Sequence, residues 1–467
     1  MKIDRAAIPG MKVTVMGLGI NGGGLASALF FARHGARVTV TDLRPAGILS
    51  ESMEKLRDFP VRYVLEKHVD SDFAGADLVI KNPAVAPTSP FLQKAREAGV
   101  AIETDLSVFL TLALNPVLAV TGSKGKSTTA SAMAFVLSGD HAGTRLGGNI
   151  TVSPLAFIDD LAPADPVVLE LSSWQLGDLR GKGLLAPRIS AFTVILPDHL
   201  DRYRGMDDYV ADKKAIFQEQ RSDQKAVFNR DDPWQKDFPS QTRAQSFLYA
   251  ARPLPPGIPG AWLEQGRGFA RLTPDGEPSL VLADALVPGM HNRMNLLCAA
   301  LSLGLYGMAA ERVREGLSRF PGIEHRLEMV RSWRGIRFYN DSAATIPHAT
   351  VQALKSLPEA VVLITGGTDK NIDFSPLAEV AATPKAIILL EGTGTEKIRA
   401  ILDGAGVRYE GPFRSLKDAL EAGVARARVL AENGEASLLF SPGCTSFGMF
   451  LNEFDRGRTF KEMVAGL

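Results

Sequence analysis

Residues 118–129 combine an apolar, strand-like run with a turn bracketed by glycines, Gly122-Ser123-Lys124-Gly125-Lys126-Ser127-Thr128. Residues 130–137 then have helical character, so the turn lies where a strand passes into a helix N-terminus. Backbone N–H groups and the helix dipole can bind an anion there, while Lys126 can reach terminal phosphates and Ser127 can offer a hydroxyl to Mg²⁺. Val120 stands where the common P-loop motif has glycine, so only Gly-x-x-Gly-Lys-Ser is matched. The stretch predicts an ATP site.

Two later strands end in side chains that can do chemistry beside such a loop. A buried-strand run over 167–169 ends at Glu170, and a strand predicted over 189–196 leads to Asp198 and His199. A carboxylate at a strand end next to a phosphate loop is a common Mg²⁺ ligand. The alternatives are an ordinary exposed glutamate and a structural histidine. Because the carboxyl ends of parallel strands share one edge, we favour functional roles for Glu170 and His199.

A lysine follows on a helix with aromatic neighbours. Tyr209, Lys213 and Phe217 are spaced i, i+4 and i+8, so a helix over 209–217 places them on one face. A snorkelling side chain, with its stem on the core and its ammonium in water, is the simple explanation. Spacing alone leaves a functional role for Lys213 open.

The first part of the chain predicts a second nucleotide-binding unit. A strand over 12–16 leads to the glycine-rich turn 17–22, a helix over 25–34 and a strand over 37–41 that ends at Asp42. In a dinucleotide fold this spacing places an acidic residue at a ribose hydroxyl, so the pattern taken alone indicates NAD. The same turn can bind any diphosphate or form a tight connection in an α/β sheet. Asn82 follows a further strand over 77–80, in a proline-rich loop at a strand end.

Length and periodicity predict three α/β domains. At 467 residues the chain is too long for one core, and boundaries are predicted near Asp105 and at 321–323. The predicted domains are therefore 1–105, 106–321 and 322–467. In the last of these, strands over 336–340, 360–365, 386–390 and 437–440 each lead into a polar loop. Such loops form one ligand-binding edge of a parallel sheet.

Composition excludes several classes of function. The 52 basic and 52 acidic residues leave no excess positive charge for a nucleic acid. Cys298 and Cys444 have no metal-ligand spacing and fit a reducing cytoplasm better than a disulfide framework. The uncharged runs 13–32 and 106–123 are broken by Gly, Asn and Pro, and residues 1–5 carry mixed charge. We expect a cytoplasmic protein without membrane insertion or a signal peptide.

Taken together, these motifs resemble the Mur ligases, the ATP-dependent amide-forming enzymes of peptidoglycan precursor synthesis, over almost the whole chain. The matching stretches, in the family's order and spacing, are Thr121–Thr128, Gly147–Ile150, Leu169–Leu176, Asp198–Tyr203, Lys213, His291–Asn295, His325–Glu328 and Asn340–Ser342. The resemblance implies a Rossmann-like N-terminal domain that binds a UDP substrate, a central P-loop ATPase-like domain and a Rossmann-like C-terminal domain. A chain of independent motifs is more specific than any one of them.

The resemblance also implies roles for individual residues. The catalytic residues would be Lys126, Glu170, His199 and Lys213, with Lys213 carried as a carbamate. Two Mg²⁺ sites would use Ser127, Glu170, His199 and Lys213. ATP would contact Gly122, Ser123, Lys124, Gly125, Lys126, Ser127, Thr128, Asn292, Asn295, Arg326 and Asp341. The UDP substrate would contact Gly17, Gly19, Ile20, Asn21, Gly22, Asp42, Arg44, Asn82, Asn149, Ser172 and Ser173.

The implied reaction joins UDP-N-acetylmuramoyl-L-alanine to D-glutamate through an acyl phosphate, with D-glutamate held by Lys370, Ser446 and Phe454. No Asp-Asn-Pro-Arg motif of the diamino-acid-adding ligases occurs, which favours an acidic acceptor. Two departures concern phosphate binding: Lys124 replaces the usual Asn, and Ala343 replaces a lysine often found after Asp-Ser in D-glutamate-adding members. We expect a monomer. A Mur-type ligase with another acceptor, an NAD-dependent dehydrogenase and a non-catalytic ATP-binding regulator are the alternatives.

Overall fold

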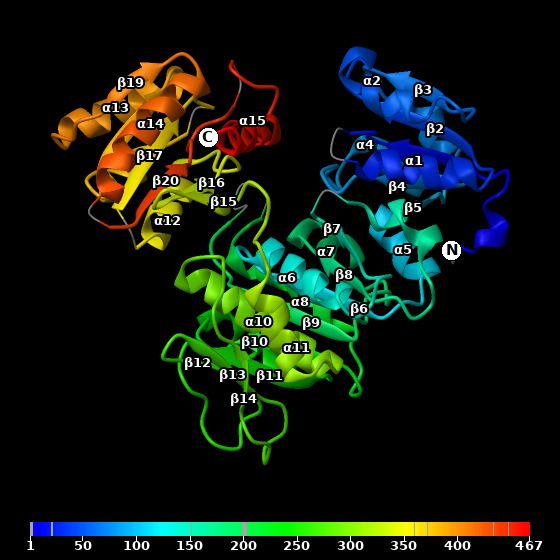
Figure 1. The fold of residues 1–467 in the computed structure, drawn as a ribbon. Coiled ribbons are helices and arrows are strands. Elements are labelled where there is room, and N and C mark those ends of the chain that lie inside the picture. Colours follow the sequence, from blue (N-terminus) through cyan, green and yellow to red (C-terminus); the bar gives the residue numbers. More distant parts are fainter. Residues whose placement is uncertain are drawn as a thin grey trace. The chain divides into compact units, whose positions relative to one another are not determined.

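A computed structural model describes residues 3–19, 22–150, 152–198, 203–358, 360–370, 372–432, 434–446 and 448–467. Its strands form three sheets of five, nine and six strands (Figure 1). The chain divides into two compact units, one comprising residues 1–283 and 295–317, the other residues 284–294 and 318–467. The first unit contains the first two sheets, and the second unit contains the third.

The first sheet is parallel, with the strand order β3-β2-β1-β4-β5. Its elements are η1 (Arg5–Ala7), β1 (Lys12–Met16), α1 (Gly23–Arg33), β2 (Arg37–Asp42), α2 (Ala46–Glu54), β3 (Arg62–Leu65), α3 (Asp70–Ala74), β4 (Leu78–Lys81), α4 (Pro90–Glu97), β5 (Ala101–Glu103) and α5 (Asp105–Leu112). Apolar residues of α1 and α5 cover one face and those of α3 and α4 the other. This is the Rossmann-like order that the sequence predicts.

The second sheet has the order β14-β13-β12-β11-β10-β9-β6-β8-β7. Its strands are β6 (Val117–Thr121), β7 (Arg145–Gly148), β8 (Val167–Glu170), β9 (Ile189–Phe192), β10 (Lys225–Asn229), β11 (Gln245–Ala250), β12 (Gly260–Glu264), β13 (Arg267–Arg271) and β14 (Ser279–Leu282). Its helices are α6 (Lys126–Ser138), η2 (Pro154–Ala156), η3 (Ile158–Asp160), α7 (Ser173–Leu179), α8 (Met206–Gln218), η4 (Pro233–Gln235), α9 (Phe238–Gln241), α10 (Met290–Tyr306) and α11 (Ala310–Ser318). Strands β8 and β9 flank β6 in parallel, so their carboxyl ends lie beside the phosphate loop.

The third sheet has the order β15-β16-β20-β17-β18-β19, with only β15 and β16 antiparallel. Its elements are β15 (Glu328–Trp333), β16 (Ile336–Asn340), α12 (Pro347–Ser356), β17 (Ala360–Gly366), η5 (Ser375–Val380), β18 (Ala386–Leu390), α13 (Thr393–Gly404), β19 (Glu410–Phe413), α14 (Leu416–Ala431), β20 (Ala436–Phe440) and α15 (Glu453–Ala465). Helices α12 and α13 pack with η5 on one face, while α14 and α15 cover the other. Strands buried on both faces explain the continuous apolar runs in the sequence.

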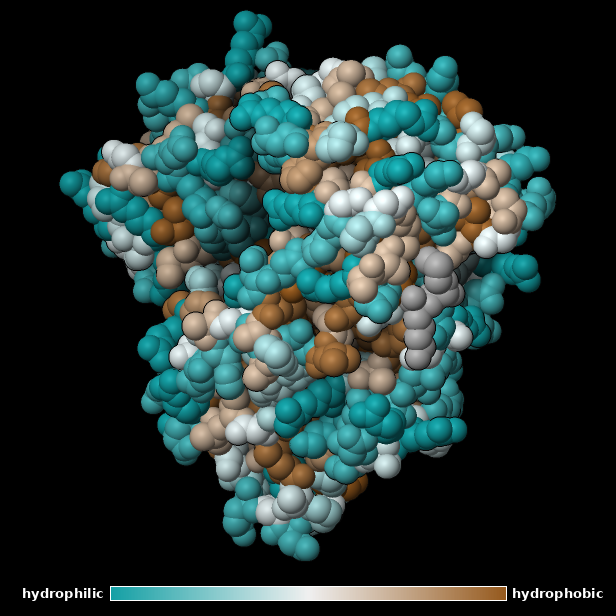
Figure 2. Space-filling model, turned by 90° about the vertical axis from the view of Figure 1, so that its right-hand side faces the viewer, coloured by the Kyte–Doolittle hydropathy of each residue, from teal (hydrophilic) through white to brown (hydrophobic). Residues whose placement is uncertain are grey.

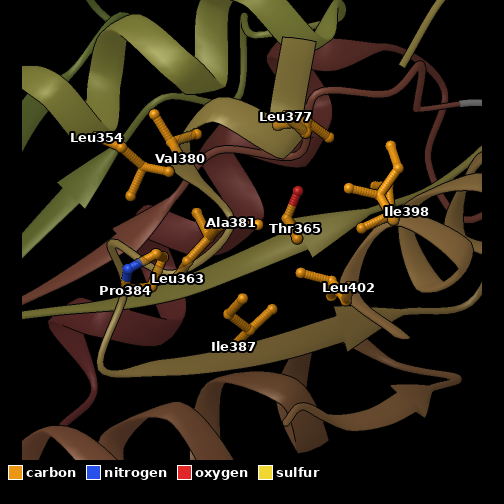
Figure 3. Close-up of a pocket in the computed structure, with 11 residues that line it drawn as sticks. Leu354, Leu363, Thr365, Leu377, Val380, Ala381, Pro384, Ile387, Ile398 and Leu402 are labelled. Carbon is orange, nitrogen blue, oxygen red and sulfur yellow. The ribbon is translucent and has the colours of Figure 1, made fainter. Parts of the chain in front are cut away.

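A cavity of about 20 Å³ lies within the third sheet's apolar layer (Figure 3). Its walls are almost entirely aliphatic, among them Leu363 and Leu402, and Thr365 contributes the one hydroxyl, which donates to the carbonyl of Pro442 at 2.9 Å. An ordered water needs several polar partners, so this space belongs to the core. It does not contain the predicted acceptor residues Lys370, Ser446 and Phe454.

Most predicted strands are confirmed, but two predicted boundaries are wrong. Strand β9 ends at Phe192 rather than at 196, because residues 193–196 instead bond to the phosphate loop. The sequence predicts a helix over 296–306 with side-chain amides before it that could cap it, but helix α10 begins at Met290, so Asn292 and Asn295 lie inside the helix and do not cap it. The Pro- and Gly-rich stretch 251–276 predicts short strands and turns, and β12 and β13 lie within it, whereas β14 and β15 were not predicted. The two domain boundaries, near Asp105 and at 321–323, remain a prediction.

No helix within the described part of the chain is long and apolar enough to cross a membrane. Figure 2 shows hydrophilic residues interspersed with smaller apolar areas on the face that it presents.

Candidate active site

The phosphate loop joins β6 to α6 through two glycines in left-handed conformations. Gly125 has φ +88° at the position before the helix, and α6 begins at Lys126. Gly122 has φ +144°, and a Cβ there would lie 1.9 Å from the hydroxyl oxygen of Thr193. Lys126 Nζ donates to the carbonyl of Ser123 at 2.9 Å, and Ser127 and Thr128 are half-buried in the first turn of α6. The predicted strand, glycine turn and helix N-terminus are thus in place.

Hydrogen bonds from neighbouring elements hold this loop. Ser123 Oγ donates to the carbonyl of Leu196 at 2.8 Å and lies 2.8 Å from Tyr209 Oη. Thr193 Oγ1 donates to the carbonyl of Lys124 at 2.6 Å. The Ser123 hydroxyl therefore fastens the loop to its surroundings. Thr193 and Tyr209 were not predicted to hold this loop, although Thr193 is a polar residue in the otherwise largely apolar run 189–196, which is a usable signal.

Lys124 lies on the exposed side of the loop. Its side chain is 65% exposed, and its Nζ is 3.5 Å from Asp198 Oδ2. The next predicted site residue, His199, lies outside the described residues, so the structure does not place it. An exposed pair of this kind contributes little to stability, which leaves the lysine free to exchange its partner for a phosphate.

Glu170 is buried at the end of β8, one strand from the loop. Its side chain is 2% exposed, and Oε1 accepts a hydrogen bond of 3.1 Å from Asn149 Nδ2. Its other oxygen, Oε2, is buried and has no hydrogen-bond partner among the residues described. A buried, unpartnered carboxylate oxygen is costly unless a cation meets it. The donor chemistry therefore fits Mg²⁺, although the described residues contain no group of three His, Cys, Asp or Glu side chains that could hold a metal by themselves.

Lys213 reaches the same loop from α8. Tyr209, Lys213 and Phe217 are each 1% exposed, which confirms the predicted helix face. The snorkelling explanation is wrong, because Lys213 Nζ ends inside the protein, donating to the carbonyl of Gly122 at 2.7 Å and lying 4.5 Å from the Tyr209 ring centroid. Burial, and then the charge of Lys126, hold the Lys213 pKa well below its usual value. Lys213 is therefore an unusually good candidate for a neutral, reactive amine.

The glycine turn of the first sheet is braced by Asp42. Gly17, Gly19 and Gly22 have φ values of +90°, +66° and +85°. Asp42 Oδ2 accepts from the Gly19 N–H at 3.1 Å, and Oδ1 accepts from the Arg44 N–H at 3.0 Å. Asp42, the acidic residue predicted from the spacing, therefore bonds directly to the glycine turn.

Other predicted UDP-site residues take varied positions around this turn. Ile20 and Asn21 lie outside the described residues. The Arg44 side chain is exposed, and Asn82 Cβ lies 3.4 Å from where a Cβ on Gly17 would be. In the second sheet, Ser172 accepts from the Gln175 N–H at 3.2 Å and caps α7, whose first residue, Ser173, is buried. Ser172 therefore has a structural function whatever it binds.

The two predicted adenine-side asparagines belong to different units. Asn295 lies beside the phosphate loop, since a Cβ on Gly125 would be 2.2 Å from its Oδ1, and its carbonyl accepts from Thr129 Oγ1 at 3.3 Å. Asn292 Nδ2 donates to the carbonyl of Pro288 at 2.7 Å within the second unit. The structure thus brings Asn295 to the ATP loop.

Asp341 is buried at the end of β16. Its Oδ2 accepts from Ser441 Oγ at 2.6 Å, and its Oδ1 accepts from the Leu327 N–H at 3.0 Å. Burial raises the pKa of Asp341 to about 7, while these hydrogen bonds and the charge of Arg326 act against the rise. Arg326 itself is exposed. Asp341 therefore holds the segment that presents Arg326.

The predicted acceptor residues lie at the carboxyl edge of the third sheet. The loops after β17 and β20 pair through Thr368 and Thr445, whose N–H groups donate to each other's carbonyls at 3.2 and 3.0 Å. Lys370 is exposed on the first loop and Ser446 is buried on the second. Phe454, on α15, is half-exposed, with its ring 5.8 Å from the His325 ring. Loop pairing thus brings the segments that carry Lys370 and Ser446 together.

Comparison with known proteins agrees with these features. Residues 120–303 match the Mur ligase middle domain, and residues 11–104 match the Mur ligase MurD-like N-terminal domain. A UDP-N-acetylmuramoylalanine--D-glutamate ligase of Treponema pallidum is 39% identical, with 99% of both chains covered. A ligase of the same name from a Roseiflexus strain is 40% identical, with 98% of this chain and 99% of its own covered. The chain belongs to the Mur ligase family.

Solved structures agree on the fold of this Mur ligase. The UDP-N-acetylmuramate-alanine ligase of Thermotoga maritima matches 98% of the chain and 99% of its own, with a TM-score of 0.60 and 20% identity. Family membership makes the protein an ATP-dependent ligase, so the dehydrogenase and non-catalytic alternatives are wrong. The N-terminal Rossmann-like sheet of this Mur ligase is part of that shared fold.

Proposed function

We propose that this chain joins D-glutamate to UDP-N-acetylmuramoyl-L-alanine, with ATP cleaved to ADP and phosphate, in the cytoplasmic synthesis of peptidoglycan precursors. The observation that carries the proposal is full-length similarity, at 39% and 40% identity, to ligases named for this reaction. The gathering of the phosphate loop, Glu170 and Lys213 at one sheet edge supports it independently.

The chemistry follows from the groups at that edge. A carboxylate at neutral pH is a poor electrophile, so the terminal carboxylate of the UDP substrate first attacks the γ-phosphorus of ATP, forming an acyl phosphate and releasing ADP. The amine of D-glutamate then attacks the acyl carbon, phosphate leaves, and the nitrogen loses a proton. Lys126, at the start of α6, can stabilise negative charge that develops on the transferred phosphoryl group.

Ser127, Glu170, His199 and a modified Lys213 would hold Mg²⁺ at this site. When bound, Mg²⁺ would neutralise charge on the phosphate oxygens. The unpartnered Oε2 of Glu170 supports this assignment, because it is a hard oxygen donor that is already buried.

We also propose that Lys213 is carboxylated on Nζ. The neutral amine would attack the carbon of CO₂, forming a C–N bond and releasing one proton. The lowered Lys213 pKa favours the amine form that this step requires. The product is an anion, so repulsion from Lys126 becomes attraction and two oxygen ligands are gained. Among the described residues, Lys213 is the lysine whose surroundings best suit this change.

For the acceptor, Lys370 and Ser446 would bind the carboxylates of D-glutamate and Phe454 would contact its methylene groups. The Lys370 ammonium is exposed beside the paired loops, so it can bind a carboxylate of the ligand without having been buried as an unpaired charge in the free protein. A site built around that charge pair should reject D-alanine, because Lys370 would lose its partner.

The glycine turn of the first sheet would bind the diphosphate of the UDP substrate, with Asp42 and Arg44 toward the uridine. Calorimetry on the full chain should show binding of UDP-N-acetylmuramoyl-L-alanine and none of NAD. The opposite pattern would reverse the assignment of this turn.

The decisive assay supplies ATP and UDP-N-acetylmuramoyl-L-alanine with D-glutamate, L-glutamate, D-alanine or meso-diaminopimelate, and follows ADP and the adduct by mass spectrometry. We expect adduct formation with D-glutamate to dominate, and Lys370→Ala to weaken it selectively. Lys385→Ala, a lysine before β18 on the same sheet, is the control. Equal rates with D-alanine and D-glutamate would overturn the acceptor assignment even if ligation occurs.

A further inference from the structure

Arg456 is the largest of the fully buried side chains in the described chain. It lies in the first turns of α15 and is 2% exposed. Its Nη2 donates to the carbonyl of Ser342 at 2.7 Å, and Nη1 and Nη2 both donate to the carbonyl of Cys444 at 3.2 Å. Its Nε is buried and has no hydrogen-bond partner among the residues described.

The two carbonyls belong to loops that leave different strands. Ser342 follows β16 and is adjacent to Asp341, whereas Cys444 follows β20 and lies two residues before Ser446. Gly367, after β17, lies next to the same guanidinium, since a Cβ there would be 3.9 Å from Nη1. One side chain therefore ties the 341–344 loop to the 441–446 loop, and it lies beside Gly367 of the 367–370 loop.

The rest of α15 strengthens the attachment to the first of these loops. Ser342 Oγ donates to the carbonyl of Glu453 at 3.0 Å, and a Cβ on Gly457 would lie 2.3 Å from that hydroxyl oxygen. One turn further, Lys461 Nζ bonds to Glu324 at 3.0 Å and to Glu328 at 2.6 Å. The helix thus holds the segments on both sides of Arg326 and Asp341.

The energetics argue that this arrangement serves more than stability. Burial lowers the pKa of Arg456 to about 10, so the guanidinium stays charged at neutral pH. Its described hydrogen-bond partners are backbone carbonyls, and no described salt bridge joins it to a carboxylate. A buried charge so poorly compensated costs stability compared with an apolar side chain of similar volume. A role in holding the loops at this edge of the sheet accounts for that cost.

We propose that Arg456 is a positioning residue that fixes the spacing between the ATP-side loop at Asp341 and the acceptor loop at Ser446. The assignment of those loops rests on the proposed function. The hydrogen bonds by which Arg456 joins the Ser342 and Cys444 carbonyls, which we call the clamp, do not. A planar guanidinium can donate to both carbonyls at once. The ammonium of a lysine is a point donor and cannot span them in the same way, and glutamine carries neither the reach nor the charge.

The clamp can be tested without any substrate by amide hydrogen exchange on the full chain. Arg456→Lys and Arg456→Gln should speed exchange at residues 367–370 and 441–446, including the paired Thr368 and Thr445, while β16, β17 and β20 keep their protection. Arg458→Gln is the matched control, because Arg458 lies on the same helix with its side chain 57% exposed. Unchanged exchange in both Arg456 variants would overturn the clamp, as would loss of protection throughout the sheet.

The positioning function of Arg456 is tested by enzyme kinetics at a temperature well below the unfolding temperature of each variant. We expect kcat/KM for D-glutamate to fall on the order of 10²-fold in Arg456→Lys, as for a displaced substrate-positioning group. The KM for UDP-N-acetylmuramoyl-L-alanine should stay within twofold, because the N-terminal sheet binds it. Wild-type kinetics in a folded Arg456→Lys, or an equal loss for both substrates, would overturn the positioning function.

These outcomes remain separable from the proposed reaction. If the wild-type protein forms no adduct with D-glutamate, the proposed function fails, while the exchange experiment still decides whether Arg456 joins the loops. If Arg456→Gln does not fold, Arg456→Lys keeps the charge and supplies both measurements.

Discussion

Lys126 and Lys213 both donate to carbonyls of the phosphate loop, but they lie in very different environments. Lys126 is half-buried at the start of α6, where a phosphate can reach it, whereas Lys213 is buried beneath the carbonyl of Gly122. The charge of Lys126 also contributes to the lowered pKa of Lys213. Replacing Lys126 and replacing Lys213 should therefore reduce activity for different reasons.

Replacing Lys126 by alanine should reduce turnover by about 10²–10³-fold, because one stabiliser of the transferred phosphoryl charge is lost. ADP release with all three substrates measures the effect, and circular dichroism checks the fold. Near-normal turnover in a folded Lys126→Ala protein would contradict the ATP-loop assignment.

Replacing Lys213 by alanine should also abolish activity, but here added formate or acetate should restore part of it by supplying the missing carboxylate oxygens. Lys214→Ala is the matched control, since Lys214 lies on the same helix with its Nζ 5.1 Å from the Phe238 ring. Carbon-13 bicarbonate should give a carbamate signal in the wild type. Its absence at saturating ATP and Mg²⁺ would argue for a plain amine.

Asp341 should make stability depend on pH. Its pKa is about 7 in the folded protein against 3.8 as a reference, so between these values the folded state binds the extra proton. Its contribution is therefore fully present below about pH 4, falls as pH rises to about 7 and is then constant, with a slope of at most about 1.4 kcal/mol per pH unit. In urea unfolding, the free energy of unfolding of Asp341→Asn should lack this dependence on pH. The unfolding is followed by the fluorescence of Trp333 in a variant that lacks the other tryptophans. Parallel pH curves for the two proteins would contradict it.

At the scale of elements, α6 depends on a glycine at its first turn and on α10 beside it. Gly125 precedes α6 in a left-handed conformation, and the Asn295 side chain fills the space where its Cβ would lie. This one position therefore links the phosphate loop to α10, a helix far along the chain.

Gly125→Ala should therefore lower the free energy of unfolding by about 1–2 kcal/mol from backbone strain alone, with a further loss from displacing Asn295. It should also weaken binding of a non-hydrolysable ATP analogue in calorimetry. Gly47→Ala is the control, because Gly47 lies in α2 with nothing within 4 Å of the new Cβ. Equal effects of the two substitutions would show that the left-handed turn is unimportant.

Across the whole molecule, every proposed contact to substrate comes from a single chain, so catalysis should not require association. We predict a monomer of 50.2 kDa by light scattering and a specific activity that is independent of enzyme concentration. A mass near twice that value, with activity lost on dilution, would show that a second copy contributes to the site.

The sequence by itself determined the three α/β patterns, the phosphate loop and the buried face of α8. These features are local, since strand and helix periodicity and the glycine turns depend on residues close together in the chain. The same locality explains the errors at β9 and α10. Residues 193–196 have a strand-like sequence but bond to the phosphate loop, and residues 290–295 join a helix that packs beside Gly125.

Tertiary structure alone decided which polar groups meet. Asp42 against Gly19, Asn149 against Glu170 and Lys213 against Gly122 are contacts between distant segments, fixed by strand order. Each of these residues is a candidate from its sequence position, but its partner is not evident from the sequence. Arg456 escaped notice altogether, because a lone arginine on an amphipathic helix resembles a solvated charge until the packing of three loops around it shows that it is buried.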